Sequence, residues 1–311
     1  MLNFVWTGIC FSDESISDQY PGSPLYSKPV EVVPNVWSAI GATAAPTYEN
    51  SGHNNNLSFI LTSEGVVVIN SGAAYILAEA LHREIKQITN QPVKLIINEN
   101  GQGHAMLGNT YWHEQGVKIL AHKDADIEFR KNGYQILERM KRYNKDKAAQ
   151  TAITPPTHTF TEKVSLYMGE TKIEVLYLGA AHSPGDISVW LPDKSTVIAG
   201  DMAFHERLLP IFPETDTAAW VNTWDQGFET LNATYVIPGH GHPTNMDQVR
   251  KYTRDYLLFL RKKIKIHLEN GGGLETAYYV NQSPYSKLDT FEELAKINAG
   301  RVYEEMEFEL D

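Results

Sequence analysis

Short runs of β-branched and aromatic residues, set apart by turn residues, constrain the fold of this chain more than any other feature. Five such runs in its first half have the length and composition of β-strands: NVWSAI (35–40), LSFILT (57–62), GVVVIN (65–70), VKLIIN (93–98) and VKILAH (117–122). They follow an irregular stretch, residues 1–32, that is rich in Ser, Pro and Tyr. The first half of the chain is therefore predicted to be built on β-strands.

Two stretches with helical periodicity lie among these strands. In residues 75–89 the apolar side chains fall on one helical face: Ile76, Ala80, Leu81, Ile85 and Ile88. Residues 124–143 are strongly charged, and four of their positions are predicted to point inward: Ile127, Tyr134, Leu137 and Met140. Strands interspersed with amphipathic helices indicate an α/β protein.

The second half of the chain also alternates predicted strands and helices, and its strands include two predicted hairpins. KVSLYM and KIEVLYLG flank the turn GET, and ISVWLP and TVIAGD flank the turn DKS. A helix over about 217–231, a strand at TYVIPG and a long helix over about 246–268 follow. The last helix carries a stripe with a four-residue spacing, which predicts a core-facing side: Tyr252, Tyr256, Leu260 and Ile264.

The chain has no Gly/Ser or Pro linker and no short sequence repeat, so the domain division is simple. Residues 1–32 are predicted to be an irregular extension. Residues 33–311 are predicted to be one domain of two β-rich halves with helices outside, including the helices at the C-terminal end.

Composition excludes several classes of protein. The net charge is −11 and the 27 Lys and Arg residues do not cluster, so nucleic acid is not an expected partner. A single cysteine, Cys10, excludes a disulfide framework and a cysteine-based zinc cluster within the chain. No apolar run approaches the roughly 18 residues of a membrane span. The first residues lack the basic start and cleavage site of a secretory signal. A soluble protein is expected, and its compartment, cytoplasm or periplasm, stays open.

Three residues share a setting that is typical of a functional site. His182 follows one apolar strand in LGAAHSPGDIS, Asp201 closes TVIAGD, and His240 follows another strand in YVIPGHGHPTN. Loops at strand ends often carry metal ligands and catalytic groups, and neighbouring glycines let the backbone turn sharply there. Two imidazoles and a carboxylate suit Zn²⁺, with Fe or Mn as the next choices. Each residue taken alone is equally consistent with an ordinary hydrogen-bonded loop residue.

GAAHSPGDISVWLP, IAGD and VIPGHG, in this order, resemble the metallo-β-lactamase superfamily of hydrolases. The upstream segment NNNLSFILTSEGVVVINSG is similar to the opening hairpin of that family, although Asn70 stands where the family has an aspartate. The resemblance spans about Val33 to Thr244. It implies a four-layer αββα sandwich with the active site along one edge.

The loop NENGQGHAMLGN (98–109) lies where the family has its signature H-x-H-x-D-H. Aligned without a gap on Gly108-Asn109, the four ligand positions become Asn100, Gln102, His104 and Ala105. Shifted by one residue, they become Glu99, Gly101, Gly103 and His104. Three of the four metal ligands are absent in either alignment.

The resemblance therefore implies a remodelled centre with one metal ion. The expected ligands are His104, His182, Asp201 and His240, with Asp201 and His104 as the catalytic groups. Zn²⁺ is the expected divalent ion. Asn100 and Gln102 are expected to line the emptied half of the site, because amides are weak zinc ligands.

Three further residues are candidates for contact with the substrate. His205 and Arg207 lie in FHERLLPIF, directly after Asp201, where the family has a loop beside the substrate. His242 follows His240 by two positions and is a candidate second-layer partner. A surface ion pair for Arg207 and a solvent-facing position for His242 are the alternatives.

The sequence thus supports a metal-dependent hydrolase acting on a small ester-, lactone-, amide- or phosphate-containing substrate. The alternative is an inactive member of the superfamily, without metal, that binds a small molecule or a partner. A Ser/His/Asp hydrolase is disfavoured, because the chain has no G-x-S-x-G motif.

Overall fold

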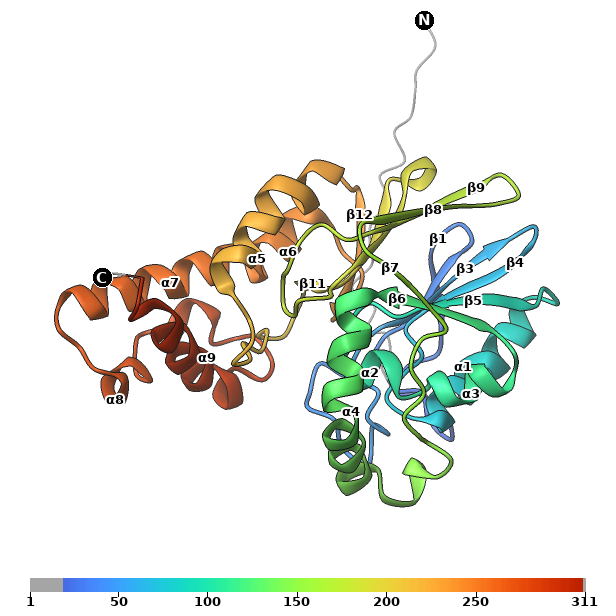
Figure 1. The fold of residues 1–311 in the computed structure, drawn as a ribbon, viewed down its shortest axis with the longest axis horizontal. Coiled ribbons are helices and arrows are strands. Elements are labelled where there is room, and N and C mark those ends of the chain that lie inside the picture. Colours follow the sequence, from blue (N-terminus) through green and yellow to red (C-terminus); the bar gives the residue numbers. More distant parts are fainter. Residues whose placement is uncertain (1–18, 310–311) are drawn as a thin grey trace, which may run out of the picture.

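The computed structural model describes residues 19–309. Within them, two β-sheets lie in the middle of the molecule and helices lie outside both (Figure 1). The larger sheet contains, in spatial order, β1 (Val30–Val33), β2 (Val36–Ala39), β3 (Leu57–Thr62), β4 (Gly65–Ile69), β5 (Val93–Ile97), β6 (Lys118–His122) and β7 (His158–Phe160). The smaller sheet has the spatial order β12 (Tyr235–His240), β11 (Thr196–Phe204), β10 (Ser188–Leu191), β9 (Thr171–Leu176) and β8 (Lys163–Met168).

The helices complete the outer layers. They are α1 (Tyr75–Ile88), α2 (Gly103–Met106), α3 (Asn109–Glu114), α4 (Lys123–Asn144), α5 (Thr217–Thr223), α6 (Met246–Tyr252), α7 (Arg254–Glu269), α8 (Leu274–Ala277) and α9 (Phe291–Met306). Shorter helical turns are η1 (Lys145–Ala148), η2 (Pro192–Lys194), η3 (Trp224–Phe228), η4 (Glu229–Leu231) and η5 (Ser283–Tyr285). No helix of residues 19–309 is long and apolar enough to cross a membrane.

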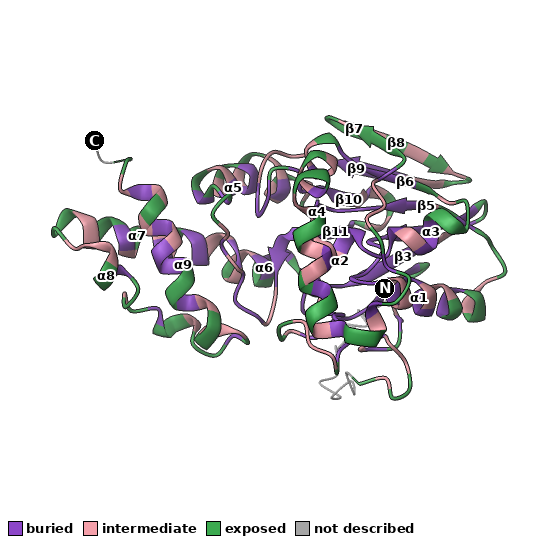
Figure 2. Ribbon diagram, turned by 60° about the horizontal axis from the view of Figure 1, so that its bottom comes forward, coloured by how far each residue is buried: buried purple, intermediate pink, exposed green. Residues whose placement is uncertain are grey.

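Alternating side chains along the strands produce the layers. In β3, Phe59 packs with the helix-side cluster that includes Leu81, whereas the next residue, Ile60, packs into the cluster between the sheets. Val189 of β10 reaches that same inner cluster from the other sheet. Successive side chains of a strand point to opposite faces, so each sheet buries both of its faces. The central strands are correspondingly buried, whereas β7 and β8 at the edges of the sheets are largely exposed (Figure 2). The fold is the αββα sandwich that the sequence predicts.

The two predicted hairpins are present. β8 pairs with β9 and β10 pairs with β11, both antiparallel. β11 continues to Phe204, however, and does not end at Asp201 as predicted. Its pairing with the parallel strand β12 is irregular around Gly200, whose φ is +60°. The strand therefore bends at the predicted site without terminating there.

The long helix predicted over 246–268 is two helices. Thr253 separates α6 from α7 and has φ −113° and ψ −79°. Its hydroxyl accepts a hydrogen bond from the backbone N–H of Phe204 at 2.9 Å, which ties the junction to the end of β11. Tyr256, Leu260 and Ile264 are buried as predicted. The helix predicted over 217–231 is likewise shorter, because α5 passes into π and 3₁₀ turns after Thr223.

The prediction for the inward face of α4 was half wrong. Leu137 and Met140 are buried, but Ile127 is 52% exposed and Tyr134 is 74% exposed. The face that packs inward passes through Phe129 and Gly133 instead. Because Gly133 has no side chain, α4 can approach Ile153 closely. The spacing of apolar residues in the sequence does not reveal this contact.

Residues 1–18 of the predicted extension lie outside the described residues, as does the segment considered as a secretory signal. Residues 19–29 contain no helix or strand, but β1 begins at Val30, inside the stretch 1–32 that was predicted to be irregular. They nevertheless contact the domain. Leu25 is 1% exposed, and the backbone N–H of Tyr26 donates to Nδ1 of His53 at 2.8 Å.

Candidate metal centre

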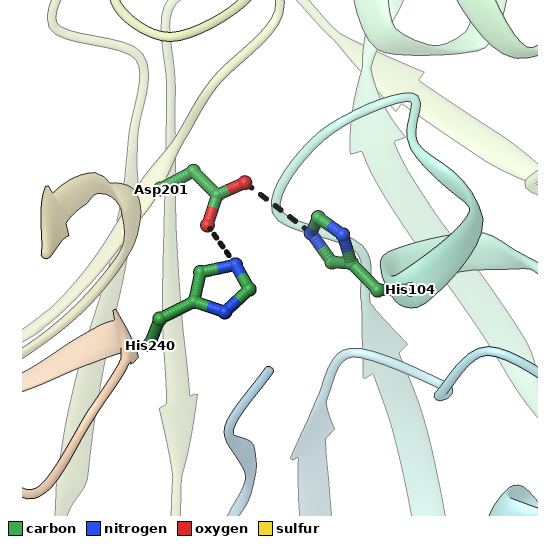
Figure 3. Close-up of side chains that lie close together, drawn as sticks. All are labelled: His104, Asp201 and His240. Atoms are coloured by element: carbon green, nitrogen blue, oxygen red, sulfur yellow. Dashed lines mark ion pairs between the residues drawn. The ribbon is translucent and has the colours of Figure 1, made fainter. Parts of the chain in front are cut away.

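Four sequence-predicted residues meet at one edge of the sandwich. His104 is the second residue of α2, Asp201 lies in the irregular part of β11, and His240 is the last residue of β12. One ligand atom from each of these three lies within 4.8 Å of the other two. Figure 3 shows the three side chains pointing toward one another. His182, from the loop after β9, reaches the same carboxylate.

Asp201 is the centre of the group. Its Oδ2 lies 3.3 Å from Nε2 of His104 and 3.4 Å from Nδ1 of His182, and its Oδ1 lies 3.3 Å from Nε2 of His240. A separation of about 3.4 Å is what two ligands of one tetrahedral ion have when their metal bonds are about 2.1 Å long. A charge-assisted hydrogen bond is shorter, at about 2.7–2.9 Å. The pair formed by His242 Nδ1 and Glu206 Oε2, at 2.7 Å, shows that shorter spacing elsewhere in this protein.

The side chains of the centre are buried, and three of their polar atoms lack a hydrogen-bond partner among residues 19–309. Asp201 and His182 are each 1% exposed and His240 is 4% exposed. Nε2 of His104, Nε2 of His182 and Oδ1 of Asp201 have no hydrogen-bond partner in the part of the chain that the structure describes. Buried polar atoms are normally paired, so unpaired ones that face one another indicate a place for a cation. The donor set therefore fits one divalent ion.

Local structure fixes each ligand. Ala105, Met106 and Leu107 are fully buried beside His104 and anchor α2. The carbonyl of Ala105 accepts hydrogen bonds from the Ser71 backbone and from the Asn98 side chain, at 2.9 and 2.7 Å. Two buried contacts thus hold the short helix against the larger sheet.

The loop of His182 is held by Asp186. Oδ2 of Asp186 accepts from the backbone N–H of Ser183, and its Oδ1 accepts from the Ser183 hydroxyl at 2.9 Å. The His182 ring contacts three aromatic rings: Phe204, Phe212 and Trp220. A packed and hydrogen-bonded loop gives the imidazole a single orientation.

The tautomer of His240 follows from its neighbours. Its Nδ1 makes a short contact with the carbonyl oxygen of Asn54, which can only accept a hydrogen bond. Nδ1 therefore carries the proton, and the nearby guanidinium of Arg207 cannot donate to it. Nε2 of His240 is left with a lone pair that faces Asp201, as a metal ligand requires.

Electrostatics favour deprotonated ligands at most positions. Burial lowers the pKa of both His182 and His240 to about 4, so both imidazoles are neutral at pH 7. Burial alone raises the pKa of Asp201, but the histidines around it hold that pKa well below its usual range. Burial lowers the pKa of His104, yet the charges of Asp201 and Glu99 raise it to about 10. Without a metal ion, the proton on His104 therefore supplies the positive charge of the centre.

The structure distinguishes between the two alignments of the signature. His104 stands beside Asp201 and His240, which favours the shifted alignment. Asn100 is fully buried and does not line the cavity, contrary to the expectation for it. Its amide donates to Oδ2 of Asp201 at 3.1 Å. Gln102 does line the cavity, with Nε2 3.1 Å from Nδ1 of His182.

At position 101, one of the positions that carry a metal-binding histidine in the shifted alignment, there is no space for a side chain. A Cβ on Gly101 would lie 2.6 Å from the carbonyl oxygen of Ala125 and 2.9 Å from Oε2 of Glu128. Both distances are too short for real contacts, and the first involves backbone. A histidine at this position is therefore excluded by the start of α4.

A cavity of about 420 Å³ opens over the centre. Among its lining residues are His104, His182, Asp201, Arg207, His240, Gln102, Glu128, Arg139, Tyr143, Phe212 and Glu214. Arg207 is 6% exposed, so the surface ion pair considered for it is wrong. His205 and His242, predicted beside the substrate, line a separate cavity of about 530 Å³. The sharp turn at Gly241, whose φ is +89°, separates them from His240.

Sequence reasoning missed three residues of this region. Glu99 is 1% exposed and lies 3.3 Å from Nε2 of His104. Glu128 lines the cavity, and Asn54 fixes the tautomer of His240. Glu99 could have been found from the shifted alignment, where it takes the place of the first histidine. Glu128 and Asn54 carry no signal, because their position depends on packing between distant segments.

The comparisons with known proteins agree with the fold. The family model of the metallo-beta-lactamase superfamily matches residues 104–251, the segment that contains all four predicted ligands. This match, the relatives and the solved structures below together support membership of the metallo-beta-lactamase superfamily.

Relatives within the superfamily are distant. The metallo-beta-lactamase type 2 of Bacteroides fragilis is 24% identical over 193 residues, which cover 58% of this chain and 70% of the relative. That of Bacillus cereus is 25% identical over 185 residues, 58% of this chain and 64% of the relative. The match thus spans about two thirds of these relatives' length.

Solved structures of the superfamily show the same fold. A metallo-beta-lactamase from Pontibacter korlensis has a TM-score of 0.61 at 19% identity, covering 74% of this chain and 98% of that one. The inverting sec-alkylsulfatase Pisa1 from Pseudomonas sp. has a TM-score of 0.67 at 18% identity. It covers 90% of this chain, and the matched part is 51% of the alkylsulfatase chain.

Proposed function

We propose that this protein is a metal-dependent hydrolase with a single divalent ion, held by His104, Asp201 and His240. Zn²⁺ is the first candidate for this ion. The observation that carries the proposal is the convergence of these three buried ligands within 4.8 Å at the base of a cavity. His182, the fourth residue of the predicted set, lies outside this group of three, although its Nδ1 is 3.4 Å from Oδ2 of Asp201. Membership of a superfamily of hydrolases supports the same reaction class.

The protein's own groups prepare the centre for this chemistry. When bound, the ion supplies a Lewis acid that polarises a substrate oxygen and lowers the pKa of a water in the cavity. The carbonyl of Asn54 holds the proton of His240 on Nδ1, and the amide of Asn100 orients the Asp201 carboxylate. These contacts keep the donor atoms in place, which limits the reorganisation needed during reaction.

Glu128 is the proposed proton carrier of the reaction. It lines the cavity beside the centre, and its buried Oε2 has no hydrogen-bond partner among the described residues. Burial and the nearby charge of Glu214 raise the pKa of Glu128 to about 7. A carboxyl group that titrates near neutrality can accept a proton from an attacking water and release it to a leaving group. It would take over the role of the missing signature aspartate.

The cavity suits a small substrate with polar groups. Its volume of about 420 Å³ lies in the range of small-molecule sites. The guanidinium groups of Arg139 and Arg207 line it and can contact an anionic or carbonyl oxygen. The proposed substrates are small esters, lactones, amides and phosphate esters. Sulfate esters join the set because the alkylsulfatase shares the fold.

The proposal is tested by reconstitution of activity. The protein is purified without chelator, its metal content is measured, and hydrolysis of a panel of these substrates is followed. We expect bound metal and at least one hydrolytic activity, both lost with a chelator and restored by Zn²⁺. A protein that takes up no metal and hydrolyses no member of the panel would instead support the alternative of an inactive binding protein.

A further inference from the structure

We infer that Glu99, which lies beside the group formed by His104, Asp201 and His240, is an additional ligand of the same ion. This inference rests on the proposed function, because it concerns the same metal centre. It differs from the signature of the superfamily, which supplies histidine at the corresponding position. The geometry around Glu99 points to this role in four respects.

The first is the state of the Glu99 carboxylate. Glu99 is 1% exposed, and neither of its side-chain oxygens has a hydrogen-bond partner within residues 19–309. Its backbone is fixed on both sides: its N–H donates to Oδ1 of Asn70 at 3.0 Å and its carbonyl accepts from Ile187 at 2.9 Å. A buried carboxylate without partners is costly, so a rigidly placed one is expected to have a function.

The second is the distance to His104. Oε1 of Glu99 lies 3.3 Å from Nε2 of His104, the same separation as that between this nitrogen and Oδ2 of Asp201. Both are longer than a charge-assisted hydrogen bond and match the edge of a metal coordination shell. Nε2 of His104 thus has a carboxylate on each side at the spacing of fellow ligands.

The third is charge. Glu99 and Asp201 are both buried beside the same imidazole. Two neighbouring carboxylates in a buried site repel each other and lose hydration. A divalent cation offsets both negative charges, whereas the single proton of His104 offsets only one. A divalent ion beside both carboxylates would therefore relieve this repulsion.

The fourth is the space left by Gly200. A Cβ at Gly200 would collide with Oε2 of Glu99, and Gly200 has φ +60°. The glycine that bends β11 at Asp201 is thus also the one that admits the Glu99 carboxylate. One bend in the strand therefore places two candidate ligands next to each other.

Glu99 changes the expected metal preference. Carboxylate oxygens favour Mn²⁺ and other hard ions, and imidazole favours Zn²⁺ among the metals considered. Replacing the family's histidine by glutamate therefore raises the affinity for Mn²⁺ relative to that for Zn²⁺. Zn²⁺ still binds more tightly in absolute terms, following the general order of divalent metals.

The test is a titration of metal-free full-length protein with Zn²⁺ and, separately, with Mn²⁺, using a chromophoric chelator as competitor. Glu99→Gln removes the charge at nearly constant shape and is expected to weaken both affinities at least about tenfold. Glu99→His is expected to raise the preference for Zn²⁺ over Mn²⁺ at least about tenfold relative to the unaltered protein. Glu84→Gln is the control, because Glu84 is 6% exposed and bonds Tyr20 away from the centre.

The outcomes separate this inference from the proposed function. If the unaltered protein binds neither ion, both are overturned. If it binds Zn²⁺ and Glu99→Gln binds it within about twofold as well, the Glu99 assignment is overturned and the three-ligand centre stands. If Glu99→Gln does not fold, Glu99→Asp keeps the charge but withdraws the oxygens. A loss of affinity in that variant supports the assignment, and unchanged affinity overturns it.

Discussion

Asp201 shows how a single residue can organise a centre whose other parts have changed. Asn100 donates to its Oδ2, and three imidazoles surround its two oxygens. A Cβ at Gly239 of β12 would collide with its Oδ1. The position of this carboxylate is thus determined by neighbours on one strand, one short helix and two loops.

His104 is predicted to be indispensable for metal binding. His104→Ala removes one of the three converging metal ligands, so the affinity for Zn²⁺ is expected to fall at least about 100-fold. This loss is larger than the loss expected when a residue that only hydrogen-bonds to a ligand is removed. The measurement is a competition titration of the metal-free protein. His113→Ala, which alters an exposed histidine of α3, is the matched control and should bind as the unaltered protein does. Equal affinity in both variants would remove His104 from the ligand set.

Glu128 is predicted to make stability depend on pH. Its pKa is raised to about 7 in the folded protein, from 4.5 without the fold, so the folded state binds more protons between these values. Stability therefore falls as the pH rises through this window, and Glu128→Gln removes that loss. We expect the variant to equal the unaltered protein near pH 4 and to exceed it by about 1–2 kcal/mol at pH 8.

Urea unfolding of the metal-free protein at both pH values measures this difference. The comparison is made without metal so that ligand binding does not contribute to stability. A difference between the two proteins that is the same at pH 4 and pH 8 would contradict the raised pKa of Glu128.

Gly200 is predicted to tolerate no side chain. Gly200→Val introduces a Cβ into the Glu99 carboxylate at a backbone with φ +60°, and should cost more than about 3 kcal/mol or prevent soluble expression. Gly116→Val separates crowding from backbone strain, since Gly116 has φ +71° but no atom within 4 Å of the added Cβ. Similar thermal melting of the two variants would show that crowding by Glu99 has no effect.

At the scale of elements, the junction of α6 and α7 connects the outer helices to the strand of Asp201. The Thr253 hydroxyl accepts from the N–H of Phe204, and Thr253 is fully buried. The helix break thus satisfies a backbone group at the end of β11. Thr253, the residue after Tyr252 of the predicted apolar stripe, thus has a structural role that the stripe does not indicate.

Thr253→Ala is predicted to destabilise the protein by about 1–3 kcal/mol, because it leaves the N–H of Phe204 buried and unpaired. The free energy of unfolding in urea measures the effect. Thr253→Ser retains the hydroxyl and should lose clearly less stability. An alanine variant as stable as the serine variant would mean that the hydrogen bond has little net value.

The elements also show what sequence patterns can and cannot predict. Strands such as β3 and hairpins such as β8–β9 follow from local alternation and turn residues, and both are present. The face of α4 and the break at Thr253 were wrongly predicted. They depend on contacts with Ile153 and Phe204, which are distant from them in sequence. Local periodicity contains no information about such contacts.

At the scale of the whole molecule, the sandwich brings four segments to one edge. His104 and His240 are 136 positions apart in sequence, yet their rings are 5.5 Å apart. Their convergence could be predicted, because the order of strand-end motifs resembles a known family. The burial of Asn100 and the approach of Glu128 to Gly101 could not, because they follow from how the loop at 98–103 packs against α4.

The central claim is that one ion binds among His104, Asp201 and His240. Anomalous diffraction at the zinc absorption edge, from crystals of the full-length protein loaded with Zn²⁺, tests it most directly. The predicted result is one peak per chain, within bonding distance of Nε2 of His104, Nε2 of His240 and a carboxylate oxygen of Asp201. Two peaks in this cavity, a peak that these residues do not contact, or no peak at all would contradict the claim.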